Sequence, residues 1–268
     1  RVLAHYLVNL HAINKRRGSR KIIPTPEIHT IKEIMPQVNI SDFSAVLFDL
    51  DGVIVDTEGQ YSLFWKQIGE EFSCKQAQSS LLELPSAAEN VKKYMPGMPD
   101  FALAIKGRTL TQIYDTYFPD AADRAAITER LNAFERQMDF PYIAGAREFL
   151  EALQAQGVPT AIATSSNCDK MACLYARHPE IKNLVTAVLT AEDARRSKPA
   201  PDCYLAAAER LGADISKCIV FEDSPNGLAA GRASGAFVIG VCTSLAAAEI
   251  EPLCDMYIED FKIFIEQI

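Results

Sequence analysis

The sequence predicts an α/β fold: a doubly wound parallel sheet with helices on both faces and an inserted all-helical cap domain. Short, continuous apolar runs recur from Ser44 onward, the pattern of strands that are covered on both faces. Helical segments alternate with these runs through short loops, which is typical of a parallel sheet. The segment between the first apolar run and the first of these alternating helices has helical periodicity of its own. This periodicity predicts a separate helical insert.

The predicted strands and helices follow one another in chain order. The first strand is AVLFDL, which begins at Ala45, and the later strands are PTAIATSS, NLVTAVLT, CIVFEDS and AFVIGV. Between them, GAREFLEALQAQG predicts an amphipathic helix that ends at a glycine, a common helix terminus. APDCYLAAAERLG predicts a second helix, and PNGLAAGRASG predicts a third that opens with a proline.

A helical insert follows the first strand. Apolar side chains recur at helical spacing from Tyr61 to Phe72, and Trp65 is one of them. LTQIYDTYF and AAITERLNAFERQM repeat that period. Residues 74–100 have a weaker periodicity, and their shape is left open. The insert is therefore expected to be a cap with its own apolar core, to which Trp65 belongs.

The chain divides into three predicted parts. Residues 1–40 form an N-terminal extension, residues 41–58 and 141–268 form the core domain, and residues 59–140 form the cap. The net charge is −8, made up of +5 in the extension and −13 in the rest of the chain. The basic extension loosely resembles a transit peptide but lacks a cleavage site, so no role is assigned to it.

Composition and charge argue against several classes of protein. An acidic body does not suit a nucleic-acid partner, whose phosphates require a basic face. No apolar run approaches the ~18 residues of a membrane span. The 7 cysteines include no C-x-x-C pair, which favours free thiols in a reducing cytoplasm over a zinc site. A cytoplasmic monomer without nucleic-acid or membrane partners is expected.

Three of the predicted strands end in hydrophilic residues. The stretches are FDLD, ATSS and FEDS, and a lysine in SKPAP lies in a loop just before a helix. Ligands bind at the carboxyl ends of the strands in an open parallel sheet, so these side chains are expected to converge on one site. The residues concerned are Asp49, Asp51, Thr164, Ser165, Lys198, Glu222 and Asp223.

These four stretches resemble the motifs of the haloacid dehalogenase-like hydrolase superfamily. DLDGVIVDT is similar to the D-x-D-G motif, ATSS to the second motif, Lys198 to the third and EDSPNG to the fourth. The resemblance extends from residue 44 to about residue 260 and is closest to the β-phosphoglucomutase-like phosphatases, which carry a helical cap. It implies a Rossmann-like core that performs phosphoryl transfer.

The resemblance implies a role for each acid of the first motif. Asp49 would be the nucleophile that forms an aspartyl-phosphate, which suits a carboxylate because it is already ionised at pH 7. Asp51 would protonate the leaving oxygen and then activate water. Asp56 and Glu58 are expected at the hinge to the cap, with Glu58 interpreted as part of a solvated turn.

The resemblance also implies a Mg²⁺ cofactor, a cation that takes hard oxygen ligands. Its ligands would be Asp49, Glu222, Asp223 and the backbone carbonyl of Asp51. A divalent ion, together with Lys198, would allow these acids to lie close to one another.

Two further groups of residues are expected to bind the substrate. Thr164 and the backbone of Ser165 would hold the phosphate oxygens, and Lys198 would neutralise their charge. In the cap, IKGRTLTQ is similar to the K-G-x-S-R loop that closes over the substrate of β-phosphoglucomutase. The cap residues implied are Lys106, Gly107, Arg108 and Thr109. Leu110 stands where that loop has its arginine, although a shifted loop could bring the preceding arginine there.

Three polar residues near these motifs are weaker candidates. Ser166 and Asn167 follow the second motif, but Asn167 is also placed to cap the next helix. His178, in ARHPE, is interpreted as a helix-end residue and not as a ligand or base.

The function expected is a Mg²⁺-dependent phosphatase that acts on a small phosphorylated metabolite, with a sugar phosphate favoured. A β-phosphoglucomutase is the first alternative, a haloacid dehalogenase the second and a non-catalytic protein on this fold the third. Asp51, Glu222 and Asp223 count against a dehalogenase, which needs neither a second acid nor a metal. A non-catalytic protein would be expected to lack a core residue, and Leu110 favours a phosphatase over a mutase.

Overall fold

The computed structural model describes residues 38–72, 101 and 105–265. These residues fall almost wholly within one compact unit, Ser41–Ile268. Most of the predicted N-terminal extension lies outside the described residues, and so do residues 74–100 of the cap. The predicted domain boundaries stay predictions.

The core contains a six-stranded parallel sheet with the strand order β3-β2-β1-β4-β5-β6. Its strands are β1 (Ala45–Phe48), β2 (Thr160–Ala163), β3 (Ala187–Leu189), β4 (Cys218–Glu222), β5 (Phe237–Val241) and β6 (Met256–Ile258). The predicted doubly wound α/β fold and its first five strands are confirmed. The sequence does not reveal β6, because a strand of three residues at the edge of the sheet is too short to show a hydrophobic periodicity.

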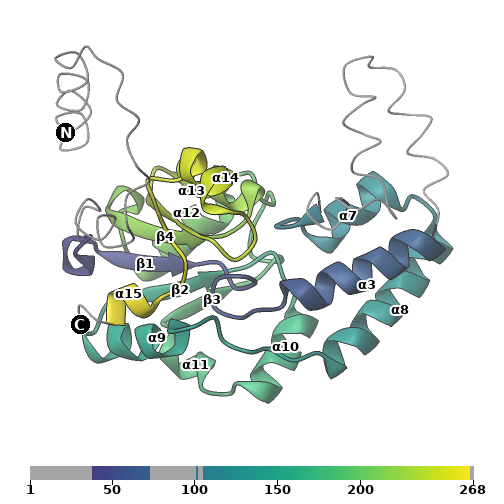
Figure 1. The fold of residues 1–268 in the computed structure, drawn as a ribbon, viewed down its shortest axis with the longest axis horizontal. Helices are drawn as coiled ribbons and strands as arrows, with labels where there is room; N and C mark the ends of the chain where they lie inside the picture. The colour runs from purple at the N-terminus through teal and green to yellow at the C-terminus, as the bar shows by residue number, and fades with distance from the viewer. Residues whose placement is uncertain (1–37, 73–100, 102–104, 266–268) are drawn as a thin grey trace, which may run out of the picture. The chain divides into compact units, whose positions relative to one another are not determined.

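Helices cover both faces of the sheet, with α12 and α13 on one face and α9, α11 and α15 on the other (Figure 1). The core helices are α9 (Ala146–Ala155), α10 (Cys168–Arg177), α11 (Ile181–Leu184), α12 (Asp202–Leu211), α13 (Pro225–Ser234), α14 (Ala247–Ile250) and α15 (Lys262–Ile265). Short 3-10 helices are η1 (Ile40–Asp42), η2 (Ile215–Lys217) and η3 (Glu251–Leu253). The three helices predicted between the strands correspond to α9, α12 and α13.

The packing of β1 explains why the strands read as continuous apolar runs. Ala45 and Leu47 belong to the apolar cluster beneath α12. The ring of Phe48 stacks on Phe221, with 5.1 Å between ring centroids, and meets Phe149 of α9 edge-on. Since helices cover both faces, all four residues of β1 are buried and no polar alternation occurs.

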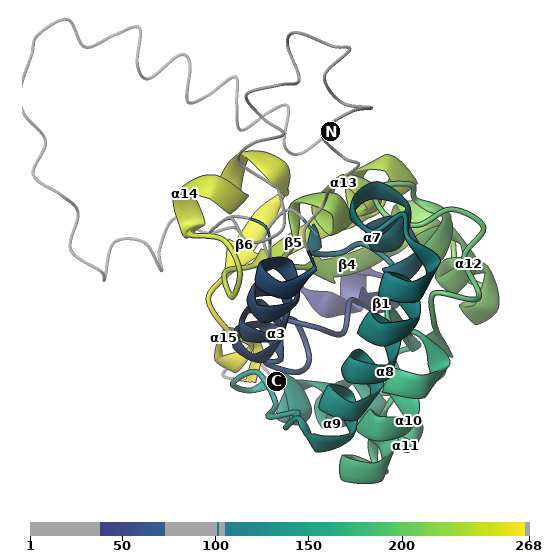
Figure 2. The same cartoon turned by 90° about the vertical axis from the view of Figure 1, so that its right-hand side faces the viewer.

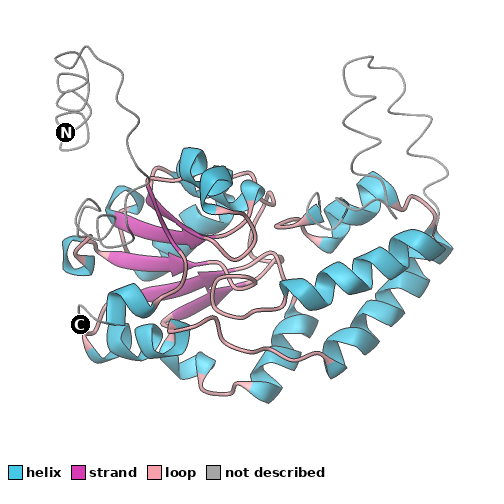
Figure 3. Cartoon of the chain, in the orientation of Figure 1, coloured by secondary structure: helices cyan, strands magenta, loops and turns pink. Residues whose placement is uncertain are grey.

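The described part of the insert contains helices and no strand (Figure 3). Its helices are α3 (Glu58–Glu71), α7 (Leu110–Tyr117) and α8 (Ala121–Gln137). α3 and α8 lie side by side (Figure 2), and an ion pair joins Glu71 to Arg130. Trp65 is buried in the aromatic cluster that these helices share, as the sequence analysis expects.

The two segments that join the cap to the core run side by side. The N–H of Asp56 donates to the carbonyl of Pro141 (2.7 Å), and the N–H of Ile143 donates to the carbonyl of Ile54 (2.9 Å). The cap therefore leaves the core and returns to it at one place.

The described cysteines are free thiols, as predicted, and Cys74 lies outside the described residues. The part of the chain that the structure describes has no helix long and apolar enough to span a bilayer. The monomeric state and the cytoplasmic location stay predictions.

Candidate active site

The site begins at the carboxyl ends of β1 and β4, which are neighbours where the strand order reverses. The N–H of Asp49 donates to the carbonyl of Phe221 (3.0 Å), so the two strands stay paired up to the site. Glu222 ends β4, and Asp223 follows it. Carboxylate oxygens of Asp49, Glu222 and Asp223 lie within 4.8 Å of one another, and all three side chains are buried.

Lys198 lies among these acids. Its side chain is 1% exposed, and Nζ donates to Oδ1 of Asp49 (2.8 Å) and to Oε1 of Glu222 (2.6 Å). Burial alone would lower the pKa of Lys198, but the charges of the two carboxylates raise it above its usual value. Lys198 is therefore a buried cation, and the structure brings it to the strand-end acids, where the sequence analysis places it.

Both carboxylate oxygens of Glu222 accept hydrogen bonds from the protein. Oε1 also accepts from the phenol of Tyr204 (2.7 Å), and Oε2 accepts from the N–H groups of Asp223 (3.0 Å) and Ser224 (3.3 Å). The sequence analysis does not identify Tyr204, because its position fits the buried face of α12. These bonds fix Glu222 as the anchor of Lys198.

Asp223 keeps one oxygen without a partner. Oδ2 accepts from the hydroxyl of Ser244 and pairs with Nζ of Lys106 (3.0 Å), whereas the buried Oδ1 has no hydrogen-bond donor in the described part of the chain. Burial raises the pKa of Asp223, although Lys106 opposes this. Gly52 makes room for Asp223: its φ is +75°, and a Cβ there would lie 1.9 Å from Oδ2.

The buried acids present a set of oxygens that fits a divalent cation. Burial raises the pKa of Asp49 well above its usual value; the charge of Lys198 opposes this, but Glu222 and Asp223 raise it further. A cation beside them would relieve this repulsion and would give the unpartnered Oδ1 of Asp223 a ligand role. Metal binding by these residues stays a prediction.

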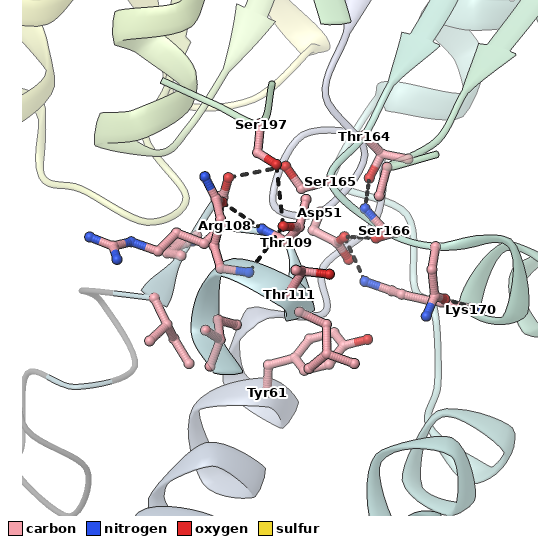
Figure 4. Close-up of a pocket in the computed structure, with 18 of the residues that line it drawn as sticks. Asp51, Tyr61, Arg108, Thr109, Thr111, Thr164, Ser165, Ser166, Lys170 and Ser197 are labelled. Carbon is pink, nitrogen blue, oxygen red and sulfur yellow. Dashed lines mark hydrogen bonds and ion pairs between the residues drawn. The ribbon is translucent and has the colours of Figure 1, made fainter. Parts of the chain in front are cut away.

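Asp51 lines the same cavity, and Ser166 and Lys170 contact its carboxylate (Figure 4). The hydroxyl of Thr57 donates to Oδ1 (2.5 Å), and the hydroxyl of Ser166 (2.9 Å) and Nζ of Lys170 (2.6 Å) donate to Oδ2. Burial opposes ionisation, but the charge of Lys170 and these hydrogen bonds hold the pKa of Asp51 below its usual value. These contacts therefore favour the carboxylate form of Asp51.

Thr164 and Ser165 line the same cavity as Asp49. The hydroxyl of Thr164 accepts a hydrogen bond from the N–H of Ser166 (3.0 Å), and the hydroxyl of Ser165 donates to the carbonyl of Gly107 in the cap (3.0 Å). Their predicted role in binding phosphate stays a prediction.

The weaker candidates have distinct places. Ser166 contacts Asp51, whereas Asn167 is the N-cap of α10 and accepts from the N–H of Lys170 (2.9 Å). His178 ends α10, as expected.

The cap loop at residues 105–109 meets the core at the cavity. The side-chain amide of Asn226 donates to the carbonyl of Lys106 (2.9 Å), and the hydroxyls of Thr109 and Ser197 lie 3.2 Å apart. Core and cap therefore touch through backbone atoms, small polar groups and the ion pair between Lys106 and Asp223.

Gly107 is required by the close approach of this loop. Its φ is +70°, and a Cβ there would lie 2.6 Å from the hydroxyl oxygen of Ser224. All four predicted cap residues, Lys106, Gly107, Arg108 and Thr109, line the cavity. The Arg108 side chain points away from Asp51 (Figure 4).

The sequence interpretation of Glu58 as a solvated turn is wrong. Glu58 is half-buried, lines the cavity and pairs with Nζ of Lys106 (2.9 Å). Burial raises the pKa of Glu58 to about 7, although the charge of Lys106 opposes this. The contact comes from a distant loop that folds back onto α3, which a local pattern does not reveal. Asp56 is exposed at the hinge.

These groups open into one cavity of about 630 Å³, a size typical of small-molecule sites. It is also lined by Tyr61, Glu135 and Lys170, which the sequence analysis does not assign to the site. Tyr61 fits the apolar face of a helix, and the two charged residues lie on helices without a motif, so no local signal identifies them.

Comparison with known proteins places this fold and site among characterised families. A family model described as haloacid dehalogenase-like hydrolase matches residues 43–235. A protein of Drosophila melanogaster described as a probable pseudouridine-5'-phosphatase is 29% identical over 230 residues, which are 81% of this chain and 93% of that protein. A β-phosphoglucomutase of Mycobacterium bovis is 29% identical over 226 residues, covering 78% of this chain and 85% of the other.

A solved structure agrees with these matches. The crystal structure of a HAD hydrolase, family IA, variant 3, from Entamoeba histolytica superposes with a TM-score of 0.61 at 26% identity, covering 82% of this chain and 94% of that one. The chain therefore belongs to the haloacid dehalogenase-like hydrolase family, which confirms the resemblance seen in its sequence motifs.

Proposed function

We propose that the protein is a Mg²⁺-dependent phosphatase that hydrolyses a small sugar phosphate through an aspartyl-phosphate on Asp49. The observation that carries this proposal is the position of Asp49. Its carboxylate lies at the end of β1, is paired with the buried Lys198, has two further acids beside it and faces the cavity.

The enzyme class is a phosphomonoester hydrolase of the haloacid dehalogenase-like family. The family match and the phosphatase among the relatives confirm the predicted class. Both of those named relatives, the phosphatase and the mutase, act on phosphorylated compounds according to their names, which supports a sugar phosphate as the substrate.

Mg²⁺ would be held by Asp49 and Asp223, together with Glu222 and the backbone carbonyl of Asp51. The unpartnered buried Oδ1 of Asp223 and the raised pKa values of Asp49 and Asp223 support this set. When bound, the cation would supply positive charge beside the phosphoryl oxygens.

In the first step, a carboxylate oxygen of Asp49 forms a bond to phosphorus while the ester P–O bond breaks. This step requires Asp51 in its protonated form, with the proton taken up from solvent before the step; Asp51 gives that proton to the departing oxygen, so the leaving group departs as a neutral alcohol. Lys198 and the Thr164 hydroxyl lie where they can balance the charge on the phosphoryl oxygens.

In the second step, water attacks phosphorus and the bond between phosphorus and the Asp49 oxygen breaks. Asp51 takes the proton of that water, which restores the acid for the next turnover. The contacts with Thr57, Ser166 and Lys170 favour the carboxylate form of Asp51, which is the form that this second step requires.

A mutase is the second candidate, because one relative is a β-phosphoglucomutase. A mutase must retain a bisphosphorylated intermediate, and a fork of guanidinium donors suits its second phosphate. Here Leu110 lines the cavity and Arg108 points away from Asp51, so we propose hydrolysis.

A screen of phosphorylated metabolites, with and without Mg²⁺, tests the proposal by following free phosphate. We expect Mg²⁺-dependent release from sugar monophosphates. Release that is equal in excess chelator would remove the metal from the mechanism, and no release from any phosphomonoester would overturn the proposed function.

A further inference from the structure

The cavity wall around Asp51 contacts the leaving group of the substrate if Asp51 protonates the leaving oxygen, as proposed above. Lys170, Tyr61 and Glu135 form this wall, which we call the leaving-group wall. It combines residues from the core helix α10 with residues from the cap helices α3 and α8.

Lys170 is the core member of the leaving-group wall. Its side chain is 6% exposed, and Nζ lies 2.6 Å from Oδ2 of Asp51 and 4.3 Å from the centre of the Tyr61 ring. The ammonium group therefore meets a carboxylate on one side and an aromatic face on the other. Its charge is compensated by Asp51 before any substrate binds.

Glu135 is the acidic member of the leaving-group wall. It is 5% exposed, and Oε1 accepts a hydrogen bond from the phenol of Tyr61 (2.8 Å). Its other oxygen, Oε2, has no hydrogen-bond donor among the described residues. It is also not one of the described polar atoms that are both fully buried and without a hydrogen-bond partner. Since Glu135 lines the cavity, Oε2 is the oxygen through which it could accept a hydrogen bond from a ligand there.

The charges on this side of the cavity do not suit a second anionic group. Lys170 is paired with Asp51, and Lys106 is paired with Glu58 and Asp223. Arg108 points away from this side of the cavity (Figure 4). The acceptor that remains is Oε2 of Glu135, whose charge only the already paired Lys170 offsets. A carboxylate oxygen attracts hydroxyl donors and repels a phosphate or carboxylate.

We propose that the leaving-group wall selects an uncharged, polyhydroxylated leaving group, with Glu135 accepting a hydrogen bond from a hydroxyl of the sugar or polyol. The substrate is then a monophosphate without a second anionic group. This inference rests on the proposed phosphatase function and names the substrate class of that site.

The test compares three substrates on one preparation of the full chain with Mg²⁺. Sorbitol 6-phosphate carries hydroxyls, p-nitrophenyl phosphate carries none, and fructose 1,6-bisphosphate carries a second anion. We expect kcat/KM for sorbitol 6-phosphate to exceed that for the bisphosphate by at least about tenfold, since the carboxylate of Glu135 repels the second phosphate.

Glu135→Gln should lower kcat/KM for sorbitol 6-phosphate by about 10- to 100-fold, chiefly through KM, because a charged acceptor is lost. Hydrolysis of p-nitrophenyl phosphate should change by less than about threefold, since that substrate offers no hydroxyl donor. Glu129→Gln is the matched control: it removes the same charge from an exposed position on α8, and should change neither substrate.

Tyr61→Phe separates recognition from support of the cap. It removes the Tyr61–Glu135 hydrogen bond but keeps the carboxylate and the aromatic face, so the preference for sorbitol 6-phosphate should persist. If Tyr61→Phe has the same effects as Glu135→Gln, or if Glu135→Gln slows both substrates equally, Glu135 has only a structural role and the inference is wrong.

The wild-type enzyme gives a separate test. If it releases phosphate in a Mg²⁺-dependent reaction but prefers the bisphosphate, the inference is wrong and the proposed phosphatase function is still supported. No release from any of the three would overturn the phosphatase itself.

Discussion

Asp49 and Gly107 both line one cavity and are held there in different ways. Asp49 follows a fully buried strand, and its carboxylate accepts from a lysine that is itself buried. Gly107 belongs to a cap loop that touches the core through the hydroxyl of Ser165 on its carbonyl and through the neighbouring carbonyl of Lys106. The first group is fixed by the sheet, whereas the second depends on how the cap lies on the core.

This difference separates chemistry from recognition. The core side carries the nucleophile, the acid–base residue and the buried cation, so changes there should remove turnover of every substrate. The cap side, with its loop and the residues Tyr61 and Glu135, should determine which substrate is accepted. The following predictions test that division, from the largest expected effect to the smallest.

Asp49→Asn should abolish turnover, because it removes the nucleophile while keeping the shape of the side chain. Phosphate release from any sugar monophosphate measures the effect, and the unfolding midpoint checks the fold. Asp56→Asn, at the exposed hinge, is the control and should retain activity. A rate for Asp49→Asn above about a hundredth of the wild-type rate would remove Asp49 from this role.

Chelation should abolish activity, and Mg²⁺ should restore it. Ca²⁺ should restore little, because it takes more ligands at longer distances and would disturb the line between nucleophile and phosphorus. Activity titrated against each cation measures this. Full activity in excess chelator would mean that the reaction needs no metal ion, and it would favour the dehalogenase alternative.

Asp51→Asn should lower the rate on sugar phosphates by about 10²- to 10⁴-fold, the usual contribution of a general acid. The loss should be smaller on p-nitrophenyl phosphate, whose leaving group departs without a proton. Comparing kcat for the two substrates measures the difference. An equal loss on both would mean that Asp51 is not the general acid.

The protein should release phosphate and should not isomerise sugar phosphates. Coupled assays for phosphate and for glucose 6-phosphate, run on β-glucose 1-phosphate with added bisphosphate, measure the two products together. We expect negligible glucose 6-phosphate, because Leu110 has no charge with which to retain a bisphosphate. Isomerisation faster than phosphate release would make the protein a mutase.

Thr109→Ala should have the smallest effect. Thr109 is the N-cap of α7, in a capping box with Gln112, and the loss of such a cap costs about 0.5–2 kcal/mol. We expect a lower unfolding midpoint, with KM raised more than kcat is lowered. Thr109→Ser keeps the hydroxyl and is the control. An effect of the alanine variant on kcat alone would show that the loop takes part in the chemical step.

The acidic residues of the core side were predictable because they follow apolar strand segments that can be recognised in the sequence. Asp49 comes directly after the apolar strand β1, and Glu222 and Asp223 follow the apolar residues of β4; parallel strands bring such ends together. Their roles remain to be tested, but the structure places them together with Lys198, as the sequence analysis expects.

The cap side was less predictable because its contacts join distant parts of the chain. Glu58 looks like a turn residue until Lys106 folds onto it. Glu135 lies on the cap helix α8 and its neighbour Lys170 on the core helix α10, where a charged residue normally faces solvent; the packing of α10 against α8 brings both to the cavity. Periodicity reports the face of a helix but not the partner that covers it.

The paired segments at the base of the cap bear on how the chain can fold and diversify. The hydrogen bonds from Asp56 to Pro141 and from Ile143 to Ile54 hold the two ends of the insert together. The entropy of closing a loop rises only with the logarithm of its length, by about 0.6 kcal/mol for each doubling. An insert that begins and ends at this point can therefore lengthen or shorten with little penalty to the sheet. Substrate preference can change through the cap while the catalytic strands keep their sequence and their folding order.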